Sequence, residues 1–99
     1  MKQSILLIGN IGANAEVKEM EGFFLVTFNL ASTIKKNVKG IEESSTTWYN
    51  CSLIKRNNPI NMLPYLEKGK RLFVGGDITF KEFENKTYKN VSVVELNFL

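Results

Sequence analysis

The stretch "RLFVGGDITFKEF", from Arg71 to Phe83, combines a strand pattern with a feature that a flat strand lacks. Its β-branched and aromatic residues predict a strand. Gly75 and Gly76 interrupt it, and a glycine inside a strand usually marks a bulge or the tight corner of a barrel. The stretch therefore predicts a sheet that curls on itself.

Four other runs share this composition, so the chain is predicted to form five strands. They are "SILLIGNI" (4–11), "FFLVTFNLAS" (23–32), "TTWYNCSLI" (46–54) and "TYKNVSVVELNFL" (87–99). Between the third and fourth strands, "NPINMLPYLEKGKR" (58–71) predicts one short helix, with Pro64 in its first turn and Gly69 as its stop. This order is that of an all-β, five-stranded OB-fold Greek-key barrel. Another small β barrel or a sandwich is the alternative that the pattern leaves open.

The composition limits the classes of function. The 99 residues suit a single domain, 1–99, and a hydrophobic share of 43% without a long apolar run indicates a soluble chain and no membrane partner. The chain has no histidine and a single cysteine, Cys51, which lies among apolar neighbours and is predicted to be buried. We therefore expect no catalytic site, no metal site, no cofactor and no small-molecule substrate. A net charge of +3 permits a polyanionic partner.

Alternation along the strands separates an inner from an outer face. The predicted inner rows are Val26, Phe28 and Leu30; Tyr49, Cys51 and Leu53; and Leu72, Val74, Ile78 and Phe80. The predicted outer surface consists of Thr27, Asn29, Trp48, Asn50, Ser52, Ile54, Thr79, Lys81 and Phe83. Exposed rings among polar and basic residues suit stacking on nucleic-acid bases. The alternative is that the rings are subunit contacts or cover the core.

Two connections are predicted to be extended loops that carry positive charge. The first, "TIKKNVKGIEESS" (33–45), contains Lys35, Lys36 and Lys39. The second, "EFENKTYKN" (82–90), contains Lys86 and Tyr88. Such loops are usually solvated, but here the lysines are interleaved with aromatic residues beside the strand of Trp48.

The order of four blocks resembles the DNA-binding domain of the bacterial and phage single-stranded DNA-binding proteins. The blocks are "ILLIGNIGANAEVKEM", "FFLVTFNLAST", "TTWYNCSLI" and "LPYLEKGKRLFVGGDI", and the resemblance covers nearly the whole chain. It implies an OB fold and non-catalytic, sequence-independent binding and protection of single-stranded DNA in replication, recombination or repair. It also implies a homo-oligomer, a tetramer or else a dimer, in the bacterial cytoplasm at the nucleoid, with a phage or mobile-element origin as an option. The alternative is an OB-fold primosomal or interaction subunit that acts mainly through protein partners.

The resemblance also assigns roles to individual residues. Trp48 matches the stacking tryptophan of the family, and Phe83 stands where the family has another tryptophan. Ile54 replaces a frequent stacking phenylalanine, and Asn50 replaces a commonly basic residue. The predicted nucleic-acid-binding residues are Trp48, Phe83, Ile54, Asn50, Thr27, Asn29, Lys35, Lys36, Arg56, Lys81, Lys86 and Tyr88.

The C-terminal end departs from the family pattern. Family members usually continue into a flexible linker and an acidic tip that recruits other enzymes, whereas this sequence ends at "VVELNFL" in the fifth predicted strand. The expectation is a truncated chain or a compact member without a recruiting tail.

Overall fold

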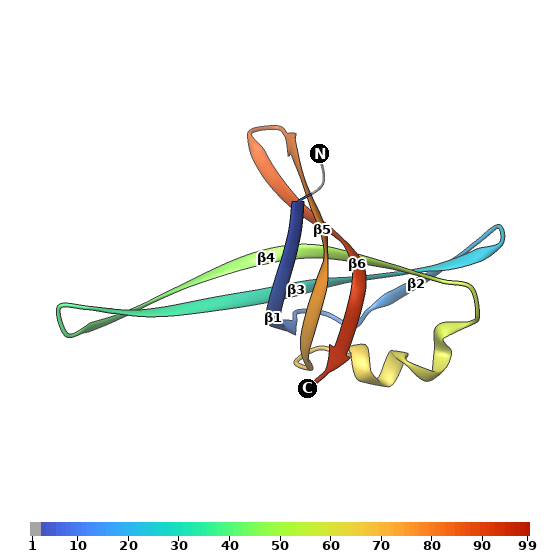
Figure 1. Ribbon diagram of the computed structural model, residues 1–99, viewed down its shortest axis with the longest axis horizontal. Helices are drawn as coiled ribbons and strands as arrows, with labels where there is room; N and C mark the ends of the chain where they lie inside the picture. Colours follow the sequence, from blue (N-terminus) through green and yellow to red (C-terminus); the bar gives the residue numbers. More distant parts are fainter. Residues whose placement is uncertain (1–2) are drawn as a thin grey trace.

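The computed structural model describes residues 3–99 and is built almost entirely of strands (Figure 1). Within these residues the elements are β1 (Gln3–Ile11), β2 (Glu16–Met20), β3 (Phe23–Val38), β4 (Ile41–Lys55), η1 (Pro59–Asn61), η2 (Leu63–Leu66), β5 (Arg71–Phe83) and β6 (Lys86–Phe98). No helix in this part of the chain is long and apolar enough to span a bilayer.

Five of the strands close into a barrel. The sheet order is β1-β5-β6-β4-β3-β2, and a further pairing of β1 with β3 joins the two sides. All neighbours are antiparallel except β4 and β6, which run parallel from Asn50↔Asn90 to Ser52↔Ser92. The short pairing Asn10↔Ala31 and Ile11↔Leu30 brings the end of β1 onto β3. The predicted five-stranded OB-fold barrel is therefore confirmed, and the sandwich alternative is not.

Two local features differ from the prediction. The extra strand β2 pairs with β3 through a turn at Gly22, where φ is +86°. Its residues are mostly exposed, so they lack the apolar alternation by which the other strands are recognised. The predicted single helix is two short 3-10 turns instead. Pro59 and Pro64 each lie at the start of one turn, where a missing N–H is tolerated, and neither turn extends into an α-helix.

The core contains most of the predicted inner rows, but Tyr49 and Leu53 are only partly buried against it and Phe80 is exposed. Val26, Leu30, Leu72 and Val74 are fully buried, and Cys51 is 2% exposed. Phe80 was predicted to belong to the inner row of β5, but its side chain is 56% exposed. It has the inward parity, but it lies close to the turn of the β5–β6 hairpin, which projects from the barrel (Figure 1), and its side chain borders an open hollow with Ile5, Tyr49 and Ile78.

The glycine pair in β5 does mark an irregularity. The β5–β6 register shifts between Gly75 and Gly76, so that Val94 has no partner. A β-carbon on Gly76 would overlap the backbone carbonyl oxygen of Ser92. The two strands approach too closely there for any side chain, which is the reason that only glycine fits.

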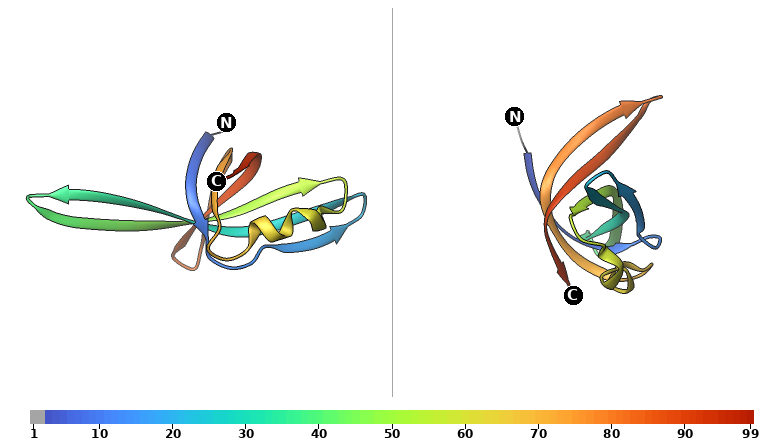
Figure 2. Two further views of the ribbon diagram at one scale, coloured as in Figure 1. Left: turned by 90° about the horizontal axis from the view of Figure 1, so that it is seen from below. Right: turned by 90° about the vertical axis from the view of Figure 1, so that its right-hand side faces the viewer.

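The predicted loops are strands of two projecting hairpins. β3 and β4 stay paired from Phe24↔Lys55 to Val38↔Ile41, and they form an arm that extends far from the barrel (Figure 1; Figure 2, left). The arm turns at Lys39 and Gly40, both with positive φ. The second hairpin turns at Glu84 and Asn85, also with positive φ, as a two-residue hairpin turn requires. Cross-strand pairing thus extends the sheet to both turns.

Candidate nucleic-acid interface

Polar side chains from four strands line up across the outer wall of the barrel. Asn29 on β3 faces Asn50 on β4, which faces Asn90 on β6, which faces Thr79 on β5. The Nδ2 of Asn50 donates a hydrogen bond to the Oδ1 of Asn90 over 3.3 Å. A second row of small polar residues runs beside the first, namely Thr27, Ser52, Ser92 and Asp77. This wall offers donors and acceptors but little bulk, so a flat ligand can approach the strands.

Two large aromatic rings flank these polar rows. Trp48, on β4 opposite Ala31, is 54% exposed, and Phe83, near the end of β5, is 58% exposed. Rings of this size are normally buried, because burial of the ring is a large favourable term. Exposed rings beside amides can stack on another flat ring.

The second ring lies in an open hollow with a basic lining. The hollow of about 290 Å³ is bounded by Asn50, Lys81, Phe83, Tyr88 and Asn90. Lys81 lies directly opposite Tyr88, and Lys86 lies opposite Phe83, so lysines and rings alternate on one face of the β5–β6 hairpin. Among the residues that the structure describes, no carboxylate lines the hollow. It can therefore hold an aromatic ring together with an anionic group.

The arm lysines do not share one face. Lys35 lies on the face that carries Trp48, and its Nζ is 3.9 Å from the Oε1 of Glu42. Lys36, the next residue, points to the opposite face of the arm and lies across from Glu43. The two lysines were predicted to lie in one loop, but the strand conformation directs their side chains to opposite faces.

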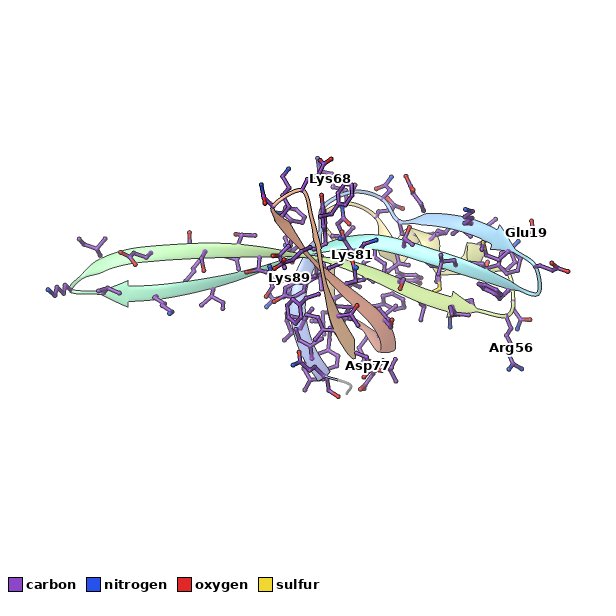
Figure 3. The ribbon with its side chains drawn as sticks, turned by 90° about the horizontal axis from the view of Figure 1, so that it is seen from above. Glu19, Arg56, Lys68, Asp77, Lys81 and Lys89 are labelled. Atoms are coloured by element: carbon purple, nitrogen blue, oxygen red, sulfur yellow. The ribbon has the colours of Figure 1, made fainter. Side chains whose placement is uncertain are left out.

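Two other predicted residues lie apart from the hollow. Ile54 is on the outer face of β4 opposite Leu25 and is 64% exposed. Arg56 follows the end of β4, and Figure 3 shows it at the far end of the barrel from Lys81 and Lys89. The structure therefore brings Asn50, Lys81, Phe83, Lys86 and Tyr88 together, with Thr27, Asn29 and Trp48 on the adjoining strands.

One residue of the hollow was not among the predicted site residues. Asn90 bounds the hollow and accepts the hydrogen bond of Asn50. It has the same strand parity as Lys86 and Tyr88, so continued alternation along β6 would have found it.

Within the described residues, the site has neither a reactive nucleophile nor a cluster of metal ligands. Burial raises the pKa of the Cys51 thiol to about 12, so this cysteine stays protonated and inert. Within residues 3–99, no three side chains of His, Cys, Asp or Glu gather closely enough to hold a metal ion.

Solved structures define the class of the fold. An SSB of Plasmodium falciparum, solved in complex with ssDNA, aligns with a TM-score of 0.77 at 24% identity and covers 97% of this chain and 93% of its own. A small single-stranded DNA-binding protein of Streptomyces coelicolor aligns with a TM-score of 0.79 at 18% identity over 98% of this chain and 94% of its own. The fold is that of OB-fold single-strand binding domains.

Sequence comparison gives the family itself. Residues 2–98 match the model of the Single-strand binding protein family, and the chain belongs to this family. The mitochondrial single-stranded DNA-binding protein of Drosophila melanogaster is 30% identical over 84 residues, which are 84% of this chain and 58% of the fly protein. The single-stranded DNA-binding protein of Onion yellows phytoplasma is 31% identical over 108 aligned positions, 100% of this chain and 95% of its own length.

The family assignment confirms the resemblance inferred from the sequence blocks. The chain spans less than three fifths of the fly protein, with a coverage of 58%. Members of the family are non-catalytic binding proteins, so the prediction that the chain is not an enzyme is confirmed.

Proposed function

We propose that this chain binds single-stranded DNA without sequence preference through the outer face that carries Trp48 and the β5–β6 hollow. The observation that carries the proposal is the exposure of two rings among amides and lysines on a single face. Base stacking on such rings is worth roughly 1–3 kcal/mol per base and tolerates any base, because every base has a π face. The lysines then neutralise phosphates on either side of the stacked bases.

The biological role that we propose is to coat and protect exposed strands during replication, recombination or repair. In this proposal residues 1–99 act as one OB-fold domain in the bacterial cytoplasm, at the nucleoid or on phage DNA. Support comes from the single-stranded DNA-binding proteins of a phytoplasma and of Xylella fastidiosa, which resemble this chain at 31% and 26% identity.

The test is a titration with oligo-dT followed by the emission of Trp48, the only tryptophan in the chain. Stacking moves the ring from partial hydration into contact with a base, so we expect strong quenching. Affinity should fall with salt along a slope of about −0.7 per phosphate contacted. Duplex DNA of the same length is the control and should bind far more weakly. If oligo-dT leaves the emission unchanged and does not bind, the OB-fold interaction subunit becomes the better description.

We further propose that the chain assembles into a homotetramer, with a dimer as the smaller possibility. The outer side of β1 exposes apolar side chains, with Leu6 72% and Ile8 48% exposed, and Val94 on β6 is 77% exposed. In the described residues, positions 3–9 of β1 pair with β5 alone, which leaves the other strand edge open. A second copy of the chain would cover both the apolar face and the edge. Sedimentation that shows only an 11.3 kDa species at micromolar concentration would contradict this assembly.

A further inference from the structure

Gly12, in the connection between β1 and β2, touches the side chain of Trp48. A β-carbon built on Gly12 would overlap the Cζ3 of Trp48 and would lie 2.7 Å from Cη2 and 3.7 Å from Cε3. Because two adjacent ring carbons are so close and the third is a full ångström farther, the contact is made by the edge of the six-membered ring. Both π faces of the indole remain free of Gly12.

The position of Gly12 fixes how the indole lies on the barrel. The N–H of Gly12 donates to the carbonyl oxygen of Asn29 over 3.1 Å. β1 and β2 both pair with β3, on the edge opposite to the one that pairs with β4. The connection between β1 and β2 therefore runs along that edge of β3. Trp48 starts from β4, opposite Ala31, and its ring edge reaches Gly12, so the ring lies across the outer face of β3. Ala31 is small enough to leave that path open.

The backbone of Gly12 does not itself demand glycine. Positive φ angles occur at Gly22, Gly40 and Gly69, whereas Gly12 is outside the left-handed region. The φ angle of Gly12 therefore does not by itself require glycine. What the position cannot accept is the β-carbon, and the atoms in its way belong to the far end of the Trp48 side chain.

We propose that Gly12 is a positioning residue for DNA binding. Because Gly12 has no side chain, the Trp48 ring can lie across β3 with its outer π face presented to a base. The inference rests on the proposed function, since it presupposes that Trp48 stacks on DNA. Its physical basis is preorganisation: a ring that is already placed loses less conformational freedom on binding than a mobile one.

The experiment compares Gly12→Ala with the wild type, first without DNA and then with oligo-dT. Without DNA, the variant should shift the emission maximum and lower the anisotropy of Trp48, because the displaced ring becomes more mobile and more hydrated. With oligo-dT, Gly12→Ala should weaken binding about 3- to 10-fold. The complete loss of one stacked base would weaken binding roughly 5- to 140-fold, and the displaced ring should lose only part of that. Ala13→Ser, which also adds one heavy atom in the same connection, is the control and should change neither measurement.

A double-mutant cycle separates positioning from other effects of the substitution. In the Trp48→Ala background, Gly12→Ala should cost no further affinity, because no ring remains to be displaced. An equal loss in both backgrounds would overturn the inference. If Gly12→Ala unfolds the chain, the pair Gly12→Ala with Trp48→Phe should fold and bind like Trp48→Phe alone, since the smaller ring does not reach Gly12. A pair that also fails to fold would overturn it too.

The failure of the proposed function gives a different result. If Trp48→Ala binds oligo-dT as well as the wild type, stacking by Trp48 is wrong. The DNA-free emission and anisotropy still test the contact in that case, and unchanged spectra in Gly12→Ala would reject the positioning role by themselves.

Discussion

Removal of one carboxylate from the β3–β4 arm should strengthen DNA binding. The Nζ of Lys35 is 3.9 Å from the Oε1 of Glu42, and their side chains are 70% and 69% exposed. Both lie on the face of the arm that carries Trp48. In the proposed binding mode, a phosphate that approaches Lys35 must compete with Glu42. Glu42→Gln removes the competitor and keeps the shape of the side chain.

The expected gain follows from the strength of an exposed ion pair. Such a pair is worth about 0.2–1 kcal/mol, because water and salt screen both charges. Release of Lys35 should therefore raise the affinity for oligo-dT by a factor of about 1.4–5 at low salt. If Lys35 then makes one new phosphate contact, the plot of log affinity against log salt should steepen by about 0.7.

Glu43→Gln provides the matched control for this prediction. It changes the net charge by the same amount, but Glu43 lies on the opposite face of the arm, across from Lys36. The assay is quenching of Trp48 by oligo-dT at four or five salt concentrations for both variants. A larger gain and a steeper slope for Glu42→Gln are expected. Equal effects of the two substitutions would show that only net charge matters, and no effect of either would exclude the arm from binding.

Four further outcomes are expected. Trp48→Ala and Phe83→Ala should each weaken oligo-dT binding by roughly 1–3 kcal/mol, measured by competition with labelled oligo-dT. If only one of the two substitutions weakens binding, the other ring does not belong to the binding site. Leu6→Glu should shift the sedimenting species toward the monomer, since the carboxylate would be buried in the proposed interface; an unchanged oligomer would move the interface elsewhere. Cys51, whose pKa burial raises to about 12, should resist iodoacetamide at pH 8 until the chain unfolds. The folded thiol keeps a proton that the unfolded thiol loses near pH 9, so the free energy of unfolding should fall between about pH 9 and 12 in denaturation experiments.

The inner rows could be predicted because the part of each strand that lies in the barrel has one buried face. Alternation of Val26, Phe28 and Leu30 with Thr27 and Asn29 has a single physical solution in a half-buried strand, and the structure adopts it. The prediction that Phe80 belongs to the buried inner row was wrong for the complementary reason. Its parity is correct, but parity states only which side a residue faces and not whether another layer of protein lies there.

The arm could not be predicted from alternation because neither of its faces is buried. Residues 33–45 are exposed throughout, so no apolar period marks them as strands. Their pairing is visible only when the two-residue turn at Lys39 and Gly40 is known. Because the strand conformation of the arm was not predicted, the opposite directions of Lys35 and Lys36 were not predicted either. In a loop, both lysines could have pointed to one side.

The site itself depends on contacts between segments that are distant in the sequence. Asn50 and Asn90 are 40 residues apart and meet because β4 and β6 pair in parallel, a register that no local signal fixes. Gly12 and Trp48 meet because the end of β1 crosses onto β3. The sequence around Gly12 does not show that its neighbour in the fold is the ring of Trp48. Closure of the barrel thus does more than bury the core, because it brings together the groups that orient the ring proposed to stack on DNA.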